Sequence, residues 1–124
     1  MEQAQVLSLN RNPAEVARAR RYVAQQCADM PSDVRSIAQL LTSEVVTNAL
    51  EHGAGDIWLR LCKAESALRV EVTDASGAEP RPQQATPDSL RGRGLMILES
   101  LASTWGVAPA EPTGKTVWFT LRTR

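Results

Sequence analysis

The sequence predicts a two-layer α/β sandwich in which a mixed, mostly antiparallel sheet packs against about three helices. Three observations favour this fold class. Apolar residues recur at helical spacing over residues 13–52, and they alternate at strand spacing over residues 56–74 and 116–121. A long polar loop, followed by a short apolar helix, separates these two groups of strands. The 124 residues fit one domain, residues 1–124, with a single core.

Charge and composition exclude several classes of protein. Fourteen Lys and Arg residues balance fourteen Asp and Glu residues, and this zero net charge argues against a protein that binds nucleic acid by neutralising phosphates. No window approaches 18 uninterrupted apolar residues, and residues 1–10 lack the pattern of an export signal. Cys27 and Cys62 have no partner at metal-site spacing and are expected to be reduced core thiols. We therefore expect a cytoplasmic protein with no membrane and no direct nucleic-acid partner.

The first helix is expected after an extended lead over residues 6–9. Asn12 is the expected N-cap, Pro13 the first helical residue, and Glu15 the acid of a capping box. Its apolar stripe consists of Val16, Ala19, Val23 and Cys27. The arginines on its other sides are expected to form a solvated face, with a partner-binding patch as the alternative; they are Arg18, Arg20 and Arg21.

The second helix is expected over about residues 33–52, introduced and capped by Pro31-Ser32 and ended by Gly53 and Gly55. Polar residues fall inside or at the edge of its apolar arc, at i, i+4 and i+8; they are Glu44, Asn48 and His52. Polar groups buried without partners cost several kcal/mol, on the order of 2–7, so these side chains must find partners. Backbone groups or an arginine could supply them, and His52 is expected to make only helix-end contacts.

Two alternating segments, residues 56–63 and 68–72, predict a hairpin around a turn at residues 64–66. Asp74 shares the parity of the apolar residues of the second strand, so in a regular strand it points towards the core. The alternative is that Asp74 only starts a turn.

Residues 75–94 form a long loop with few apolar residues, which is typical of a functional lid or a disordered segment. A short helix over residues 95–102 and strands over residues 105–108 and 116–121 complete the chain. Thr116 has the opposite parity to the apolar residues of the last strand. Its side chain can therefore reach a pocket on the core side only if the strand bends or starts there.

Three polar features can be assembled into one pocket: Glu44 with Asn48, Asp74, and the sequence Gly92-Arg93-Gly94. Asn48 offers an oxygen suited to Mg²⁺, and a carboxylate one turn away can accept a hydroxyl proton. Asp74 can accept a hydrogen bond from an exocyclic amine such as that of adenine. Glycines before a helix allow phosphate to approach free N–H groups, although Gly-Arg-Gly is also an ordinary loop sequence.

An ordered set of four segments carries a resemblance to a known family: SEVVTNALEHG, VTDASG, GRGLMILESLA with TWGV, and GKTVWF. Over about residues 11–121 the chain resembles ATP-binding proteins of the anti-sigma-factor serine kinase type. Their fold is the histidine-kinase-like ATPase type, shared with gyrase-type ATPases and Hsp90. The resemblance implies this two-layer fold for nearly the whole chain.

The resemblance also implies roles for individual residues. Glu44 matches the general base, and Asn48 matches the ligand of Mg²⁺. Asp74 matches the acid that binds the adenine amino group, with Gly77 as the glycine of the same box. The phosphate-binding glycine box corresponds to Gly92, Arg93, Gly94 and Leu95. Thr116 is similar to the threonine near the base, although Gly-Lys-Thr stands here where Gly-Thr is common, and residues 78–91 correspond to the ATP lid.

The implied function is Mg²⁺-ATP-dependent phosphorylation of a serine on an anti-anti-sigma (STAS-type) partner, coupled to binding of a sigma factor. One alternative is a non-catalytic module that sequesters a sigma factor or another regulator and responds to nucleotide. The catalytic part of a histidine kinase is less favoured, because it needs a phosphoacceptor helix upstream. Trp58 and Trp118 lie opposite the apolar alternation, so an aromatic patch there could support a homodimer or a partner interface.

Overall fold

The computed structural model describes residues 3–76, 92–110 and 114–123. Its elements in chain order are β1 (Gln3–Leu9), α1 (Ala14–Gln26), α2 (Ser32–His52), β2 (Ile57–Lys63), β3 (Ala67–Asp74), α3 (Gly92–Leu101), β4 (Thr104–Pro109) and β5 (Lys115–Arg122). The predicted order of helices and strands is confirmed. The first strand is longer than the expected lead, because it pairs along its whole length with β2.

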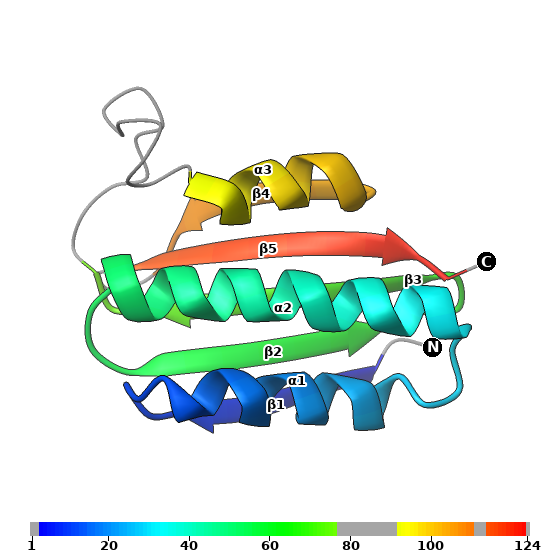
Figure 1. Cartoon of the computed structure of the whole chain (residues 1–124), viewed down its shortest axis with the longest axis horizontal. Helices are drawn as coiled ribbons and strands as arrows, with labels where there is room; N and C mark the ends of the chain where they lie inside the picture. The colour runs from blue at the N-terminus through cyan, green and yellow to red at the C-terminus, as the bar shows by residue number, and fades with distance from the viewer. Residues whose placement is uncertain (1–2, 77–91, 111–113, 124) are drawn as a thin grey trace.

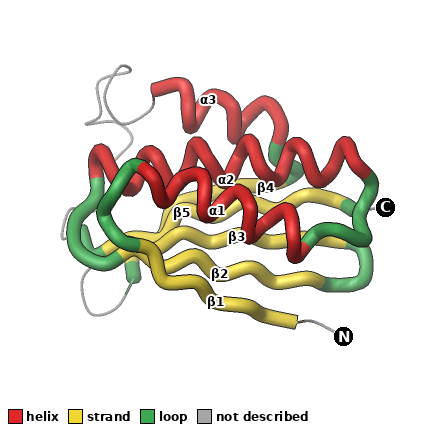
Figure 2. The backbone as a smooth tube through the Cα atoms, turned by 60° about the horizontal axis from the view of Figure 1, so that its bottom comes forward, coloured by secondary structure: helices red, strands yellow, loops and turns green. Residues whose placement is uncertain are grey.

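The strands form one five-stranded sheet in the order β1-β2-β3-β5-β4. Every neighbouring pair is antiparallel, so the sheet is fully antiparallel where a mixed, mostly antiparallel one was expected. All three helices cover one face of the sheet, with α2 lying between α1 and α3 (Figures 1 and 2). The two-layer α/β sandwich is therefore confirmed.

The core lies between the helices and one face of the sheet. Strand alternation places the apolar residues of β2, β3 and β5 on that face; they are Ile57, Leu59, Leu61, Leu68, Val70, Val72, Val117, Phe119 and Leu121, all buried. They pack against the buried stripe of α2, which includes Ala38, Leu41, Val45 and Ala49. Cys27 and Cys62 are both buried, as expected, but only Cys27 belongs to this core.

The start of α1 differs from the prediction in two details, and the first is that the helix begins at Ala14, with Pro13 and not Asn12 at the N-cap position. Asn12 Oδ1 accepts a hydrogen bond from the Ala14 N–H at 2.9 Å, as a capping side chain should. Glu15 Oε1, however, accepts from the N–H of Asn10 at 2.8 Å and not from that of Asn12. The reason is that the Asn12 N–H already donates to the carbonyl of Asn10 at 3.0 Å. Glu15 therefore anchors the turn before the helix.

The second helix begins one residue earlier than expected, and Ser32 is its first residue and not its cap. Neither Ser32 nor Pro31 makes a side-chain cap, and the carbonyl of Pro31 accepts the N–H of Arg35 at 3.0 Å. At the other end, the N–H of Gly53 donates to Ala49 at 2.9 Å and ends the helix as predicted. Among the helices of the described ranges, none is long and apolar enough to cross a membrane.

Candidate functional site

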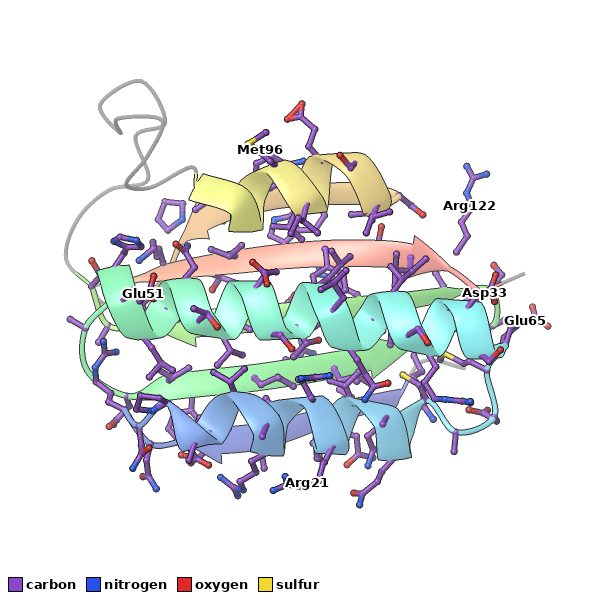
Figure 3. The ribbon with its side chains drawn as sticks, viewed as in Figure 1. Arg21, Asp33, Glu51, Glu65, Met96 and Arg122 are labelled. Atoms are coloured by element: carbon purple, nitrogen blue, oxygen red, sulfur yellow. The ribbon has the colours of Figure 1, made fainter. Side chains whose placement is uncertain are left out.

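The polar residues singled out in the sequence converge towards one end of the sandwich. The C-terminal end of α2, the end of β3 and the start of β5 meet there, because Asp74 pairs with Lys115 in the sheet register. The first turn of α3 lies at the same end, beside the C-terminal part of α2 (Figure 1). Figure 3 marks this end of α2 with Glu51.

Glu44 and Asn48 lie one turn apart on α2, and both are half-buried. Neither forms a hydrogen bond or ion pair with another residue of the described ranges. Since both are only half-buried, solvent can reach them, and the cost expected for full burial does not arise. A carboxylate and an amide oxygen are therefore available to a ligand.

These two residues lie on the side of α2 that faces α3. Gln39 Nε2 donates to the carbonyl of Arg20 in α1 at 3.5 Å, which marks the α1 side of the helix. Asn48 follows Gln39 by about two and a half turns, so it lies on the opposite side. Since α2 lies between α1 and α3, this side faces α3 (Figure 2).

Asp74 is the most enclosed acid of the site, with a side chain that is only 2% exposed. Its Oδ1 accepts the N–H of Ser76 at 2.7 Å, and its Oδ2 accepts Lys115 Nζ at 2.9 Å. The Lys115 side chain is itself 9% exposed. Desolvating both charges is costly, and it is tolerated because they are paired and hydrogen-bonded. Asp74 thus lies on the core side, as its parity predicted, and it also begins the turn that bonds Ser76.

Two glycines allow the chain to close around Asp74. A Cβ on Gly53 would lie 2.5 Å from Asp74 Oδ2, so only glycine lets the end of α2 approach the carboxylate. Gly114 has φ +144° and lies against the carbonyl of Asp74, where a side chain would collide with the backbone. The Ala75 N–H also donates to the carbonyl of Ala54 at 2.7 Å. The loop after α2 and the start of β5 therefore hold Asp74 from two sides.

Thr116 does not join Asp74. Its hydroxyl forms a 2.7 Å hydrogen bond with that of Thr73, its partner in the β3–β5 register, on the face of the sheet away from the helices. The strand alternates regularly from its first residue, without the bend that would turn Thr116 inwards. The place beside Asp74 belongs instead to Lys115. This residue was missed, although its shared parity with Val117 and Phe119 could have indicated it.

The glycine box forms the first turn of α3, since Gly92, Arg93, Gly94 and Leu95 begin this helix. Its N-terminus is the part of α3 nearest to the end of α2 (Figure 1). Helix N-termini favour anions because their first N–H groups have no intrahelical acceptor. Gly77 and the predicted lid, residues 78–91, lie outside the described residues.

His52 and the tryptophans lie apart from these groups. His52 is exposed, and its only described polar contact is a distant one of 3.9 Å to Glu51. Trp58 is 45% exposed on the helix-free face of the sheet. On the same face, the guanidinium of Arg69 lies 4.2 Å from the centroid of the Trp118 ring, and this contact covers part of the second tryptophan.

The donor set suits a cation that takes few protein ligands. Within the described ranges, no three residues of the His, Cys, Asp and Glu types come together as a metal cluster. Mg²⁺ is commonly bound by one or two protein oxygens, with phosphate oxygens and water completing its shell. The amide oxygen of Asn48 fits this requirement.

Of the comparisons with known proteins, the one with protein families gives a match. The profile of the histidine kinase-like ATPase domain matches residues 9–121, nearly the whole chain. No curated protein matched the chain. The matched range contains Glu44, Asn48, Asp74 and the first turn of α3, and it ends within β5. The chain therefore belongs to the histidine kinase-like ATPase domain family and is an ATP-binding domain of that kind.

Proposed function

We propose that this domain is a Mg²⁺-ATP-dependent protein-serine kinase of the anti-sigma-factor type, which phosphorylates a serine on an anti-anti-sigma (STAS-type) partner and binds a sigma factor. The observation that carries this proposal is the pair Glu44 and Asn48. Both lie on the α3 side of α2, one turn apart, and neither has a partner in the described ranges. An acid and an amide oxygen thus lie together on the side of α2 that faces α3.

Phosphoryl transfer requires mainly positioning and charge neutralisation. Asn48 would hold Mg²⁺, which neutralises phosphate charge when bound. Asp74 would accept the exocyclic N–H of adenine, and the N–H groups at the start of α3 would face the phosphates. Glu44 would accept the proton of the serine hydroxyl while the serine oxygen attacks the γ-phosphorus and ADP leaves.

The sharpest test replaces Glu44 with Gln. We expect phosphoryl transfer to an anti-anti-sigma substrate to fall by at least about 100-fold, because the general base is lost. ATP affinity, measured by calorimetry, should stay within about twofold, because the amide keeps the size of the carboxylate. Glu51→Gln is the matched control, since Glu51 is an exposed acid on the same helix and should leave both quantities unchanged.

The outcomes of this test separate kinase from binding module. A normal transfer rate in Glu44→Gln would show that Glu44 is not the base. A wild-type protein that binds ATP but transfers no phosphate to any candidate partner would instead favour the nucleotide-responsive module.

The assignment of Asn48 is tested through the dependence of ATP affinity on Mg²⁺. In the wild type, Mg²⁺ should strengthen ATP binding. In Asn48→Ala, the ATP affinities with and without Mg²⁺ should differ by less than about twofold, because the protein ligand of Mg²⁺ is lost. Gln39→Ala removes an amide from the opposite side of the same helix and should keep the full Mg²⁺ effect. Equal Mg²⁺ effects in wild type and Asn48→Ala would refute this role.

A further inference from the structure

Lys115 is a buried cation that bonds Asp74, and neither the sequence resemblance nor the proposed chemistry gives it a role. We propose that Lys115 determines base specificity: its ammonium group donates to the ring nitrogen of adenine that neighbours the amine bound by Asp74. This inference rests on the proposed binding of ATP at Asp74. It adds a second contact to the base and predicts which bases are rejected.

The burial of Lys115 calls for an explanation. The other core-facing residues of β5 are Val117, Phe119 and Leu121, and an apolar residue at position 115 would continue that face. Lysine is almost never buried unless it is paired, and burying an ion pair is often no better for stability than burying apolar side chains. A buried Lys115–Asp74 pair is therefore a costly way to fill this position if its role is only structural.

The pair retains unused hydrogen-bonding capacity. A lysine ammonium has three donors, and among the described residues Lys115 uses one of them, on Asp74 Oδ2. A carboxylate has about four acceptor positions, of which Ser76 and Lys115 occupy one on each oxygen of Asp74. Asp74 and Lys115 thus present an acceptor and a donor side by side, 2.9 Å apart.

This order of groups matches adenine. The Watson–Crick edge of adenine has the exocyclic amine, a donor, beside the ring nitrogen N1, an acceptor. Guanine has the reverse order on this edge, with the carbonyl O6 beside the N1–H. In the orientation that suits adenine, guanine would place its O6 against the Asp74 carboxylate and its N1–H against the ammonium. Buried mismatches of this kind carry the full desolvation cost of the unpaired groups.

The backbone fixes the position of the pair. Lys115 directly follows Gly114, which lies against the Asp74 carbonyl, and it is the register partner of Asp74 in the sheet. Gly53 abuts the other side of the carboxylate. The pairing of β3 with β5 therefore keeps the ammonium next to the carboxylate before any ligand binds. Base discrimination requires this kind of preorganisation.

The experiment compares three nucleotides: ATP, GTP and 1-deaza-ATP, in which carbon replaces N1. Affinities are measured by calorimetry for wild type and Lys115→Met. We expect wild type to bind 1-deaza-ATP and GTP at least about tenfold more weakly than ATP, as the loss of a buried hydrogen bond implies. Lys115→Met should bind ATP about tenfold more weakly than wild type and should no longer distinguish ATP from 1-deaza-ATP. Lys63→Met is the matched control, because Lys63 is the only other lysine and bonds the Gln26 carbonyl at the far end of β2.

Removing Lys115 leaves a buried carboxylate without its cation and can unfold the protein, but the comparison of the three nucleotides on wild type needs no variant. Equal binding of ATP and 1-deaza-ATP by the wild type would overturn the inference and leave the proposed ATP site intact. Tighter ATP binding by Lys115→Met would also overturn it, because Lys115 would then block the base. Absence of all nucleotide binding to the wild type would overturn the inference together with the proposed function.

Discussion

At the scale of single residues, the carboxylate and the lysine of the site show what a sequence pattern can and cannot predict. Asp74 could be placed on the core side because the residues of its strand alternate strictly. Lys115 obeys the same alternation in β5, yet lysine is so often exposed that its parity is easily discounted. Lys115 is buried because the strand register places it opposite Asp74. The register depends on both strands, so the sequence of one strand does not predict it.

Cys27 gives a prediction at the same scale. Burial raises the pKa of its thiol from 9.0 to about 11, with Lys63 partly opposing this effect. The folded pKa exceeds the unfolded one, so the stabilisation is complete below about pH 9 and is lost as the pH rises towards about 11. Two pKa units limit the loss to about 2.7 kcal/mol.

Urea unfolding at about pH 8 and about pH 10.5 tests this expectation. The free energy of unfolding of the wild type should fall more steeply between these pH values than that of Cys27→Ala, which has no thiol to ionise. The comparison uses each protein as its own reference, so the packing lost in the variant does not enter. Parallel pH profiles would contradict a raised pKa at Cys27.

At the scale of elements, the C-terminus of α2 is held by a side chain from outside the helix. The guanidinium of Arg11 donates to the carbonyl of Leu50 at 2.7 Å, in the last turn of the helix, where carbonyls have no intrahelical donor. It also donates at 3.3 Å to the carbonyl of Ala49, which accepts the Gly53 N–H as well. It also reaches Gly53 at 3.2 Å and Gly55 at 3.3 Å. Arg11 thus connects the turn before α1 to the loop that abuts Asp74.

Arg11→Met should therefore lower the free energy of unfolding by about 2 kcal/mol, as expected when charged hydrogen bonds to backbone carbonyls are lost. Amide exchange in residues 49–55 should speed up, while exchange in β2 and β3 should change only in proportion to global stability. Arg21→Met is the control, because Arg21 is an exposed residue of α1 that points away from α2 (Figure 3) and should change stability by less than about 0.5 kcal/mol. Unchanged exchange at the end of α2 would show that Arg11 does not hold it.

At the scale of the whole molecule, the sequence predicted the kinds of element and their order, because helical and strand periodicities are local. It predicted the hairpin of β2 and β3, which a short turn joins. It did not predict that β5 enters between β3 and β4, since this order depends on contacts between distant segments. Glu44, Asn48 and Asp74 could be grouped because each breaks an otherwise apolar pattern. Thr116 was assigned to the pocket because its motif resembles the family's Gly-Thr, although its parity in the strand placed it on the opposite face.

The antiparallel register also determines where the two chain ends lie relative to Asp74 and Lys115. Gln3 pairs with Lys63, Arg122 pairs with Ala67, and the Thr123 N–H bonds Ser66 at 3.0 Å, so both chain ends leave beside the β2–β3 turn (Figure 1). Asp74 and Lys115 lie at the opposite end of the same strands, roughly 20–25 Å away at the rise of a β-strand. A tether on either terminus would therefore fix the protein to a sensor surface with Asp74 and Lys115 at the end that faces the solution.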